Sequence, residues 1–358
     1  MHPRKDEMMR IIYVGPLQHG RTCTQRMMIM QRLGHEIFPV DTRPPWVADM
    51  ERRYLYRGFI RAWGPLDLVS ANRTIFEAGS SGEYDVLWLD KAVSVRAETL
   101  RRIRQKSPKT FIAGYSPDDM GNPLLQSVEF RRGLKYYDIF FTTKSYGVAE
   151  LLALGCPHVE FVHNCFDPQT HRPLPVTSDE RLRFGGAVGF IGDQEDARMR
   201  TMNFLAENGI DVRVWGPNWV RRRKKVHPNL RIEGRPIWSD EYAKAICSFD
   251  INLGFLRKVA RDLQTSRSVQ IPACRSFMLA ERTNEHLMLF EEGKEAEFFS
   301  TDQECLEKVH YYRAHPEERA RIAEGGYRRC LNSGYSQDVQ IEGLLNYSKR
   351  IVDERSAA

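Results

Sequence analysis

The sequence has few of the features that mark secreted, metal-binding or membrane-spanning proteins. Its seven cysteines are scattered, odd in number and form no C-x-x-C pair, which argues against a disulfide framework and a structural zinc site. The ten histidines show no metal-ligand spacing. No stretch approaches the roughly 20 apolar residues of a membrane helix, and the apolar run at 11–14 is too short for a signal-peptide core. We therefore expect a cytoplasmic protein.

Charge of one sign is also not in large excess. The chain has 53 basic and 47 acidic residues, which gives a formal net charge of +6. This surplus suits phosphate-bearing ligands but is far from the dense basic footprint of a dedicated nucleic-acid binder. The most basic stretch, 221–225, is interpreted as a solvated loop, with contact to an anionic polymer such as DNA as the alternative.

What the sequence does have is a regular alternation of short apolar strands and helices. A length of 358 residues favours two domains, and continuous apolar strands between helices are typical of a parallel sheet covered on both faces. Strands are predicted at 10–15, 37–41, 85–90, 110–115, 137–143 and 158–162, and again at 187–191, 210–215, 230–233, 250–255, 277–281 and 296–299. The sequence thus predicts an α/β protein with two Rossmann-like domains.

The domain boundaries follow from breaks in this rhythm. Residues 44–82 mix aromatic, basic, Pro and Gly residues and predict irregular helix and loop, whereas the Pro-containing stretch after 164 predicts a linker. We expect an N-terminal domain at 1–170, a linker at 171–185, a second domain at 186–336 and a final helix at 337–358.

Polar residues that follow the strands of the first half are the first candidates for a site, because open parallel sheets bind ligands beyond the carboxyl ends of their strands. The loop 15–20, with Gly15 and His19, lets a ligand approach the backbone but matches no dinucleotide or Walker motif. An ordinary strand–helix turn is the alternative. Lys91 ends a strand and marks either a cleft or a solvated strand end. Asp118 and Asp119 suit hydroxyl binding or general base catalysis better than metal binding, since no D-x-D is present; a helix cap is the alternative.

The second half offers a glycine turn and a hydroxyl-rich helix start. Gly192 closes a turn before a helix that carries Arg198, a pattern that suits a pyrophosphate, with a solvated arginine as the alternative. The strongest segment is 265–274, in which hydroxyls, a guanidinium and an amide stand at a helix start as phosphate oxygens require. A structural cap is its alternative. The residues concerned are Thr265, Ser266, Arg267, Ser268 and Gln270.

The segment 265–283, TSRSVQIPACRSFMLAERT, resembles the signature of CgeB-like glycosyltransferases, T-S-R-x-F-E-I-P-A-C-G-x-F-x-L-x-E-R-T, a family named for a spore-maturation protein. The likeness continues at 285–294, 311–312 and 315–318, and includes 90–91, 115–119, 141–145 and 211–217. It covers nearly the whole chain. Two departures stand out: Gln270 replaces a glutamate that grips the donor ribose, and Arg275 replaces a glycine.

The resemblance implies a GT-B fold, with the donor on the C-terminal domain, the acceptor on the N-terminal domain and a last helix that returns to the first domain. It implies transfer from a UDP-, GDP- or dTDP-sugar to a hydroxyl of a glycan or similar acceptor, with no tightly bound cofactor and no metal, by a monomer or homodimer. The expected donor residues are Gly192, Arg198, Trp215, Gly216, Thr265, Ser266, Ser268 and Gln270; the acceptor residues are Gly15, His19, Lys91 and Lys144; the catalytic residues are Asp118, Asp119 and Arg267.

Three alternatives stay open at this point. Gln270 allows a catalytically silent protein that binds sugar nucleotides or glycans, because a neutral amide holds a hydroxyl less strongly than a carboxylate does. A sugar-nucleotide epimerase or a phosphorylase of the same fold is the second alternative. The third is a nucleic-acid acceptor, which only the basic stretch 221–225 suggests.

Overall fold

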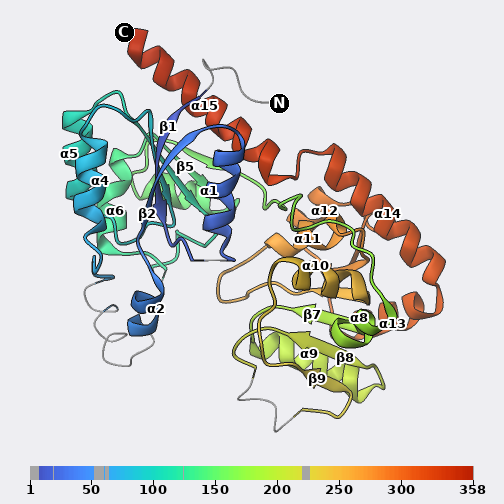
Figure 1. Ribbon diagram of the computed structural model, residues 1–358. Helices are drawn as coiled ribbons and strands as arrows, with labels where there is room; N and C mark the ends of the chain where they lie inside the picture. The colour runs from blue at the N-terminus through green and yellow to red at the C-terminus, as the bar shows by residue number, and fades with distance from the viewer. Residues whose placement is uncertain are drawn as a thin grey trace. The chain divides into compact units, whose positions relative to one another are not determined.

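A computed structural model describes residues 8–357 apart from 19, 52–59, 61–63, 124 and 220–225. The chain forms two compact units, Met1–His163 with Gln337–Ala358, and Asn164–Ser336. Each contains a six-stranded sheet in which all described pairs of strands are parallel (Figure 1). Within the described ranges, no helix combines the length and apolar character needed to cross a membrane. The architecture is therefore α/β with two domains.

The first unit has the strand order β2-β1-β3-β4-β5-β6. Its strands are β1 (Arg10–Gly15), β2 (Glu36–Asp41), β3 (Val86–Asp90), β4 (Phe111–Ser116), β5 (Ile139–Thr142) and β6 (Val159–Phe161). Its helices are α1 (Thr22–Arg32), α2 (Pro45–Glu51), α4 (Ala71–Gly79), α5 (Ala97–Lys106), α6 (Val128–Gly133), the 3₁₀ turn η2 (Leu134–Tyr136), α7 (Gly147–Ala153) and α15 (Gln337–Ala357).

Alternate residues of each central strand enter two different apolar layers, which is why the strands read as continuous apolar runs. In β3, Leu87 and Leu89 pack with apolar side chains of α4 and α5. Val86 and Trp88 point to the other layer, which contains residues of α1 and Ile341 of α15. The C-terminal helix is thus part of the first unit, where it packs on α1 and against β4.

The second unit has the strand order β12-β11-β10-β7-β8-β9. Its strands are β7 (Gly186–Ile191), β8 (Val212–Trp215), β9 (Leu230–Ile232), β10 (Phe249–Gly254), β11 (Met278–Glu281) and β12 (Glu297–Phe299). Its helices are α8 (Ser178–Phe184), α9 (Asp196–Glu207), α10 (Ser239–Ser248), α11 (Ser266–Ala273), α12 (Asn284–Leu289), α13 (Asp302–Ala314) and α14 (Pro316–Asn332).

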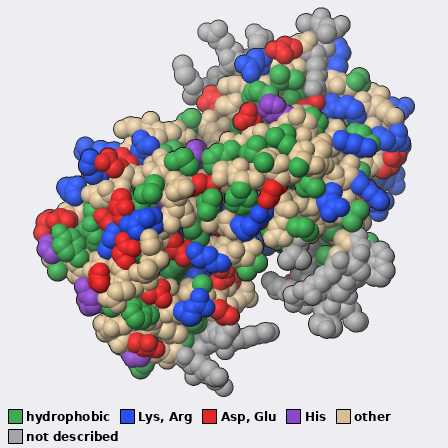
Figure 2. All heavy atoms as spheres, turned by 180° about the vertical axis from the view of Figure 1, so that it is seen from behind, with side chains coloured by type: hydrophobic (Ala, Val, Ile, Leu, Met, Phe, Trp, Pro, Cys, Tyr) green, Lys and Arg blue, Asp and Glu red, His purple; other side chains and the backbone are tan. Residues whose placement is uncertain are grey.

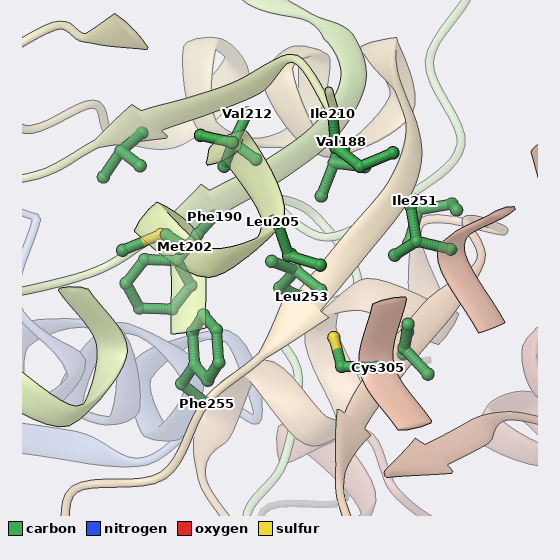
Figure 3. Close-up of a cluster of buried hydrophobic side chains, with 14 of the residues drawn as sticks. Val188, Phe190, Met202, Leu205, Ile210, Val212, Ile251, Leu253, Phe255 and Cys305 are labelled. Atoms are coloured by element: carbon green, nitrogen blue, oxygen red, sulfur yellow. The ribbon is translucent and has the colours of Figure 1, made fainter. Parts of the chain in front are cut away.

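One apolar layer of this unit lies between the sheet and helices α9 and α13 (Figure 3). Val188 and Phe190 of β7 and Ile251 and Leu253 of β10 supply its sheet side. The rings of Phe190 and Phe255 meet edge to face, with centroids 5.1 Å apart, an arrangement that aromatic pairs favour. This contact fixes Phe190 at the carboxyl end of β7, close to the residues described below.

The stretch expected as a linker, 171–185, contains helix α8. The Thr177 side chain accepts from the Glu180 N–H and the Glu180 carboxylate accepts from the Thr177 N–H, so a capping box starts the helix. This T-S-D-E signal was present in the sequence, but the neighbouring prolines outweighed it. The second unit begins at Asn164, and α8 packs on α10 within it. The region 44–82 likewise contains α2 and α4.

The docking of α15 on the first unit can be tested by truncating one buried side chain. Leu345 is 1% exposed, so Leu345→Ala should lower the free energy of unfolding of the first unit by about 2–5 kcal/mol through lost burial and a residual cavity. Val339→Ala on the same helix, where the side chain is 54% exposed, should change it by less than about 0.5 kcal/mol. Urea unfolding curves of the two variants measure the difference; equal effects would mean that α15 is not docked through Leu345.

Candidate functional site

Each sheet has one place where the chain reverses the direction in which it adds strands. In the second unit this point lies between β7 and β10, because β8 and β9 follow on one side and β11 and β12 on the other. In the first unit it lies between β1 and β3. In open α/β sheets the loops that leave the carboxyl ends of the two strands diverge at such a point, and ligands commonly bind there.

Two glycines shape the carboxyl edge of β7 and β8. A side chain at Gly216 would place its Cβ 1.9 Å from the Gly192 carbonyl oxygen, and Gly216 has a φ of +151°. The Gly192 N–H donates to the Trp215 carbonyl at 2.9 Å, and the Trp219 indole donates to the Gly192 carbonyl at 2.8 Å. The two glycines therefore allow a close backbone approach, and Gly192 precedes the loop that leads into α9.

Arg198, on the first turn of α9, is held below this edge with most of its donors unused. It is 2% exposed, and its Nη1 donates to the Asp193 carbonyl at 2.8 Å. Its Nε and Nη2 are buried and make no hydrogen bond, and the nearest carboxylate oxygen, on Glu195, is 3.9 Å from Nη2. Burial, followed by the nearby Arg267 charge, lowers the pKa of Arg198 to about 10. Unused guanidinium donors in such a place favour an anion.

Arg267 reaches the same place from the N-terminal turn of α11. Its guanidinium carbon lies 5.7 Å from the centroid of the Phe190 ring, and that of Arg198 lies 5.4 Å from the same centroid. The Arg267 Nε is buried without a hydrogen bond. Burial lowers the pKa of Arg267, although the nearby Tyr242 and Asp262 oppose that shift. Two like charges over one ring repel each other, so an anion that binds both stabilises the arrangement.

The loop after β10 is fastened by carboxylates from the neighbouring elements. Glu281, at the end of β11, accepts from the Leu256 N–H at 2.7 Å and pairs with the Lys258 ammonium at 2.8 Å. Glu195 accepts from the Lys258 N–H at 3.2 Å. These contacts join the loops after β7, β10 and β11 at one edge of the sheet. Arg257 of the loop after β10 is near enough to contribute to the lowered pKa values of both Arg198 and Arg267.

The polar residues at the start of α11 divide into two groups. Ser268 is buried, and its hydroxyl accepts from the Thr265 N–H at 3.0 Å and contacts His286 Nε2 at 2.7 Å. It therefore fastens the helix start. Thr265 and Ser266 are partly exposed, and the Ser266 hydroxyl donates to the Asn164 side chain at 3.5 Å. Of the three hydroxyls, those of Thr265 and Ser266 are the better placed to meet a ligand.

Two further predicted donor residues already have partners within the unit. The Trp215 indole is buried and donates to the Phe184 carbonyl at 2.9 Å. The Gln270 amide oxygen accepts from the Tyr242 hydroxyl at 2.7 Å. Trp215 thus serves the fold, whereas Gln270 keeps its amide nitrogen for another partner. Arg275, at a φ of +54°, pairs with Glu324 at 2.5 Å; a glycine adopts that backbone conformation more easily.

In the first unit, the carboxyl end of β3 rests on a buried ionic network. The Asp90 carboxylate is completely buried and accepts from Arg26 Nε at 2.6 Å and Nη2 at 2.9 Å, from the Tyr13 hydroxyl at 2.5 Å and from the Cys23 thiol at 3.2 Å. Burial would lower the pKa of Arg26, but the Asp90 charge raises that pKa well above its ordinary value. The network fixes the residue directly before Lys91. A Cβ at Gly15 would lie 2.8 Å from the Asp90 carbonyl oxygen, so β1 and β3 also need a glycine here.

Lys91 and Asp118 form an ion pair beside a cavity at this edge. Lys91 has a φ of +52°, which is strained for a residue with a side chain and is often found at functional positions. The cavity has a volume of about 590 Å³ and is lined by residues that follow several strands, among them Arg21, Arg43, Lys91 and Asp118. It therefore combines cations, a carboxylate and apolar walls.

The remaining candidates lie away from this cavity or outside the described residues. Asp119 is 0% exposed and Lys144 is 3% exposed, and neither lines the cavity. His19 and the basic stretch 221–225 lie outside the described residues. Basic and acidic side chains are interspersed over much of the face shown in Figure 2. Among the residues that the structure describes, no group of three His, Cys, Asp or Glu side chains could hold a metal ion.

Several residues of the site were not singled out from the sequence. Asp193 and Glu195 follow the glycine turn directly, so their position after a strand was the available signal. His286 lies one turn into a helix that follows the E-R-T triplet, but its bond to Ser268 depends on the fold. Tyr242 and Arg26 carried no signal, because each lies on a helix far in sequence from its partner.

The comparisons with known proteins agree with this architecture. A protein-family profile described as "Glycosyl transferase-like" matches residues 198–346, and no curated protein matches the chain. The structure is similar to that of HepE from Anabaena, solved in complex with UDP-glucose, with 12% identity, a TM-score of 0.64, and coverage of 96% of this chain and 99% of that one.

Two other solved structures are similar at the same level. One is an alpha-glucosyltransferase in complex with UDP-glucose and DNA containing an abasic site, with 13% identity, a TM-score of 0.67, and coverage of 96% and 100%. The other is a putative UDP-N-acetylglucosamine 2-epimerase from Listeria monocytogenes, with 10% identity, a TM-score of 0.58, and coverage of 97% of each chain. The chain thus has the two-domain α/β fold of GT-B glycosyltransferases, and the profile match supports a glycosyltransferase.

The ion pair beneath the first-unit cavity can be tested by removing one partner. Arg26→Met leaves the Asp90 carboxylate buried without its cation, so it should lower the free energy of unfolding by about 3–5 kcal/mol. Arg32→Met on the same helix breaks a partly exposed pair with Asp338 and should cost less than about 1 kcal/mol. Urea unfolding compares the two variants, and similar losses would refute a special role for the buried pair.

Proposed function

We propose that the protein is a CgeB-like glycosyltransferase of the cytoplasm that moves a sugar from a nucleoside diphosphate to a hydroxyl of a glycan or similar acceptor, without a metal ion. The observation that carries the proposal is that Arg198 Nε, Arg198 Nη2 and Arg267 Nε are buried without hydrogen bonds at the carboxyl edge of the second sheet. A diphosphate supplies both the charge and the acceptor oxygens that these donors lack. Because two similar structures were solved with UDP-glucose, a UDP-sugar is the first donor to test.

In this proposal the second unit stabilises the leaving group. When the bond between the anomeric carbon and the diphosphate oxygen breaks, negative charge collects on the diphosphate. Arg198, Arg267 and the first N–H groups of α11 lie where that charge would develop, and preorganised donors of this kind lower the barrier. Thr265 and Ser266 add hydroxyl donors. The Tyr242 hydroxyl holds the Gln270 oxygen, so the Gln270 amide N–H groups are left to donate to a ribose oxygen.

The first unit would hold the acceptor in the cavity beside Lys91. Asp118 lines that cavity and Asp119 does not, so we assign to Asp118 the orientation of the acceptor hydroxyl and, if the enzyme inverts, the removal of its proton. Lys91 pairs with the same carboxylate and holds it at the cavity. The two ligands have to meet for transfer, and exclusion of water at that moment limits hydrolysis of the donor.

If Arg198 and Arg267 bind the diphosphate, removal of either side chain should weaken nucleotide binding. Arg198→Ala and Arg267→Ala should each weaken the binding of a nucleoside diphosphate about 10- to 100-fold, because a hydrogen bond to a charged group is worth roughly 1.5–3 kcal/mol. A thermal-shift screen of UDP, GDP and dTDP on the unaltered protein selects the nucleotide, and calorimetry on the variants measures its Kd.

Arg200→Ala is the matched control, because Arg200 lies on the same helix as Arg198 with its side chain exposed. It should bind the selected nucleotide as the unaltered protein does. If both site variants keep their affinity while they remain folded, the assignment of the diphosphate site is wrong. Failure of all three nucleotides to shift the melting temperature would count against the donor class itself.

The acceptor assignment predicts a change in turnover rather than in donor binding. Asp118→Asn should reduce kcat for sugar transfer by about 10²- to 10⁴-fold, the usual contribution of a general base, and leave the Kd of the nucleotide unchanged. Chromatographic analysis of the sugar products formed with a panel of glycans measures it. A variant with unaltered transfer would remove Asp118 from the mechanism.

An epimerase is the second candidate, because the putative 2-epimerase is also among the similar folds. Incubation of the protein with the selected nucleotide sugar and no acceptor separates the two. A transferase gives at most slow hydrolysis, whereas an epimerase converts the sugar nucleotide to its epimer at full rate. A protein that binds the nucleotide and consumes no donor with any acceptor would instead be a silent binding protein.

A further inference from the structure

Two cysteines that the proposed reaction does not use lie side by side in the second unit. Cys247 is on the last turn of α10, and Cys274 follows the last residue of α11. The Cys247 thiol donates to the Cys274 carbonyl oxygen at 3.5 Å. Both belong to the apolar layer on the α10 and α11 face of the sheet. The topology therefore joins two thiols that are 27 positions apart in the sequence.

The two thiols differ in exposure in the way that a redox-active pair requires. Cys247 is partly exposed, whereas Cys274 is 2% exposed. A soluble oxidant can therefore reach Cys247 first, and Cys274 is the neighbour that can react with the oxidised sulfur. Geometry of this kind is common where one cysteine is attacked and a second one resolves the product.

We propose that Cys247 and Cys274 form a reversible disulfide when the protein meets a peroxide. Hydrogen peroxide oxidises the Cys247 thiol to a sulfenic acid, transfers one oxygen to sulfur and releases one water. The Cys274 thiol then attacks the Cys247 sulfur; the S–S bond forms, the S–OH bond breaks, and the hydroxyl leaves as water with the Cys274 proton. Two thiols and one peroxide thus give one disulfide and two waters, and a dithiol reductant reverses the change. The proposal does not depend on the function of the protein.

Local groups also favour the thiolate that starts this reaction. The pKa of Cys247 is lowered to about 7, first by the hydrogen bond from the Cys274 thiol, then, against the effect of burial, by the Leu174 N–H and the Ser276 hydroxyl. The pKa of Cys274 is raised well above its ordinary value by the same contact and by burial. The partly exposed sulfur is thus the more reactive of the two.

The pair is connected to the helix that carries Arg267. The Tyr242 hydroxyl of α10 already bonds Gln270 of α11, and a disulfide between Cys247 and Cys274 would add a covalent link between these helices. Since a disulfide needs its sulfurs about 2.05 Å apart, the link draws the end of α11 toward α10. Oxidation of the two cysteines would therefore shift the C-terminal end of α11, the helix whose N-terminal turn carries Arg267.

Peptide mapping tests the proposal directly. The folded protein is treated with hydrogen peroxide, remaining thiols are alkylated, and the chain is digested with trypsin without reduction. We expect peptide 245–257 joined to peptide 268–275, with the mass of two hydrogens missing, and separation of the two on addition of dithiothreitol. Full alkylation of both cysteines, or a link from Cys274 to Cys330 instead, would overturn the proposal.

Variants and labelling kinetics make the test independent of any one digest. Cys247→Ser should abolish the linked peptide and leave Cys274 open to alkylation after unfolding. Cys156→Ala in the first unit, where the thiol contacts the His158 carbonyl and its pKa is raised to about 11 by burial, should leave the link unchanged. Iodoacetamide labelling of Cys247 in the native protein should follow pH with a midpoint near 7. A midpoint of about 8.5 or higher, as for an ordinary thiol, would contradict the thiolate environment.

Discussion

The pairing of β7 with β10, and of β1 with β3, is the constraint on which both candidate sites depend. In the second sheet, Val188 stands opposite Ile251 although the two are separated by the whole of β8, β9 and α10. This pairing reverses the direction of chain growth and brings the loops after β7 and β10 to one edge. Arg198 and Arg267 come from helices that follow those loops. Without this pairing the two guanidiniums would have no common partner in Phe190.

At the proposed diphosphate site, the protein itself does not supply hydrogen-bond partners for all buried N–H groups of Arg198 and Arg267. A buried guanidinium usually has a carboxylate and a full set of hydrogen bonds, as Arg26 does with Asp90. Arg198 has one hydrogen bond to a carbonyl and a carboxylate only at 3.9 Å. The protein thus contains one buried guanidinium that is paired with a carboxylate, Arg26, and one that has no close carboxylate partner, Arg198. This difference supports the proposal that Arg198 binds an anion.

Much of this could be predicted from the sequence, because parallel strands are apolar on both faces and leave a strong local signal. The predicted strand 10–15 matches β1 to the residue, and the predicted strand 250–255 agrees with β10 to within one residue at each end. Helix α8 was not predicted, because its capping box Thr177–Glu180 directly follows a stretch with prolines that indicated a linker. Arg198 and Arg267 were singled out from the sequence because each lies on a segment that follows a predicted strand. The hydrogen-bond partners of Ser268 and Trp215 could not be predicted from the sequence. Only the fold brings His286 to Ser268 and the Phe184 carbonyl to Trp215.

The same reasoning explains why the two aspartates could not be separated before the fold was known. Asp118 and Asp119 are adjacent, equally charged and follow the same strand, so any local rule treats them alike. The turn after β4 sends one carboxylate to the cavity and the other into the interior. Lys91, which directly follows Asp90, forms its ion pair with Asp118. The position of each carboxylate at this edge therefore depends on the turn after β4 as well as on the strand order that brings Lys91 beside it.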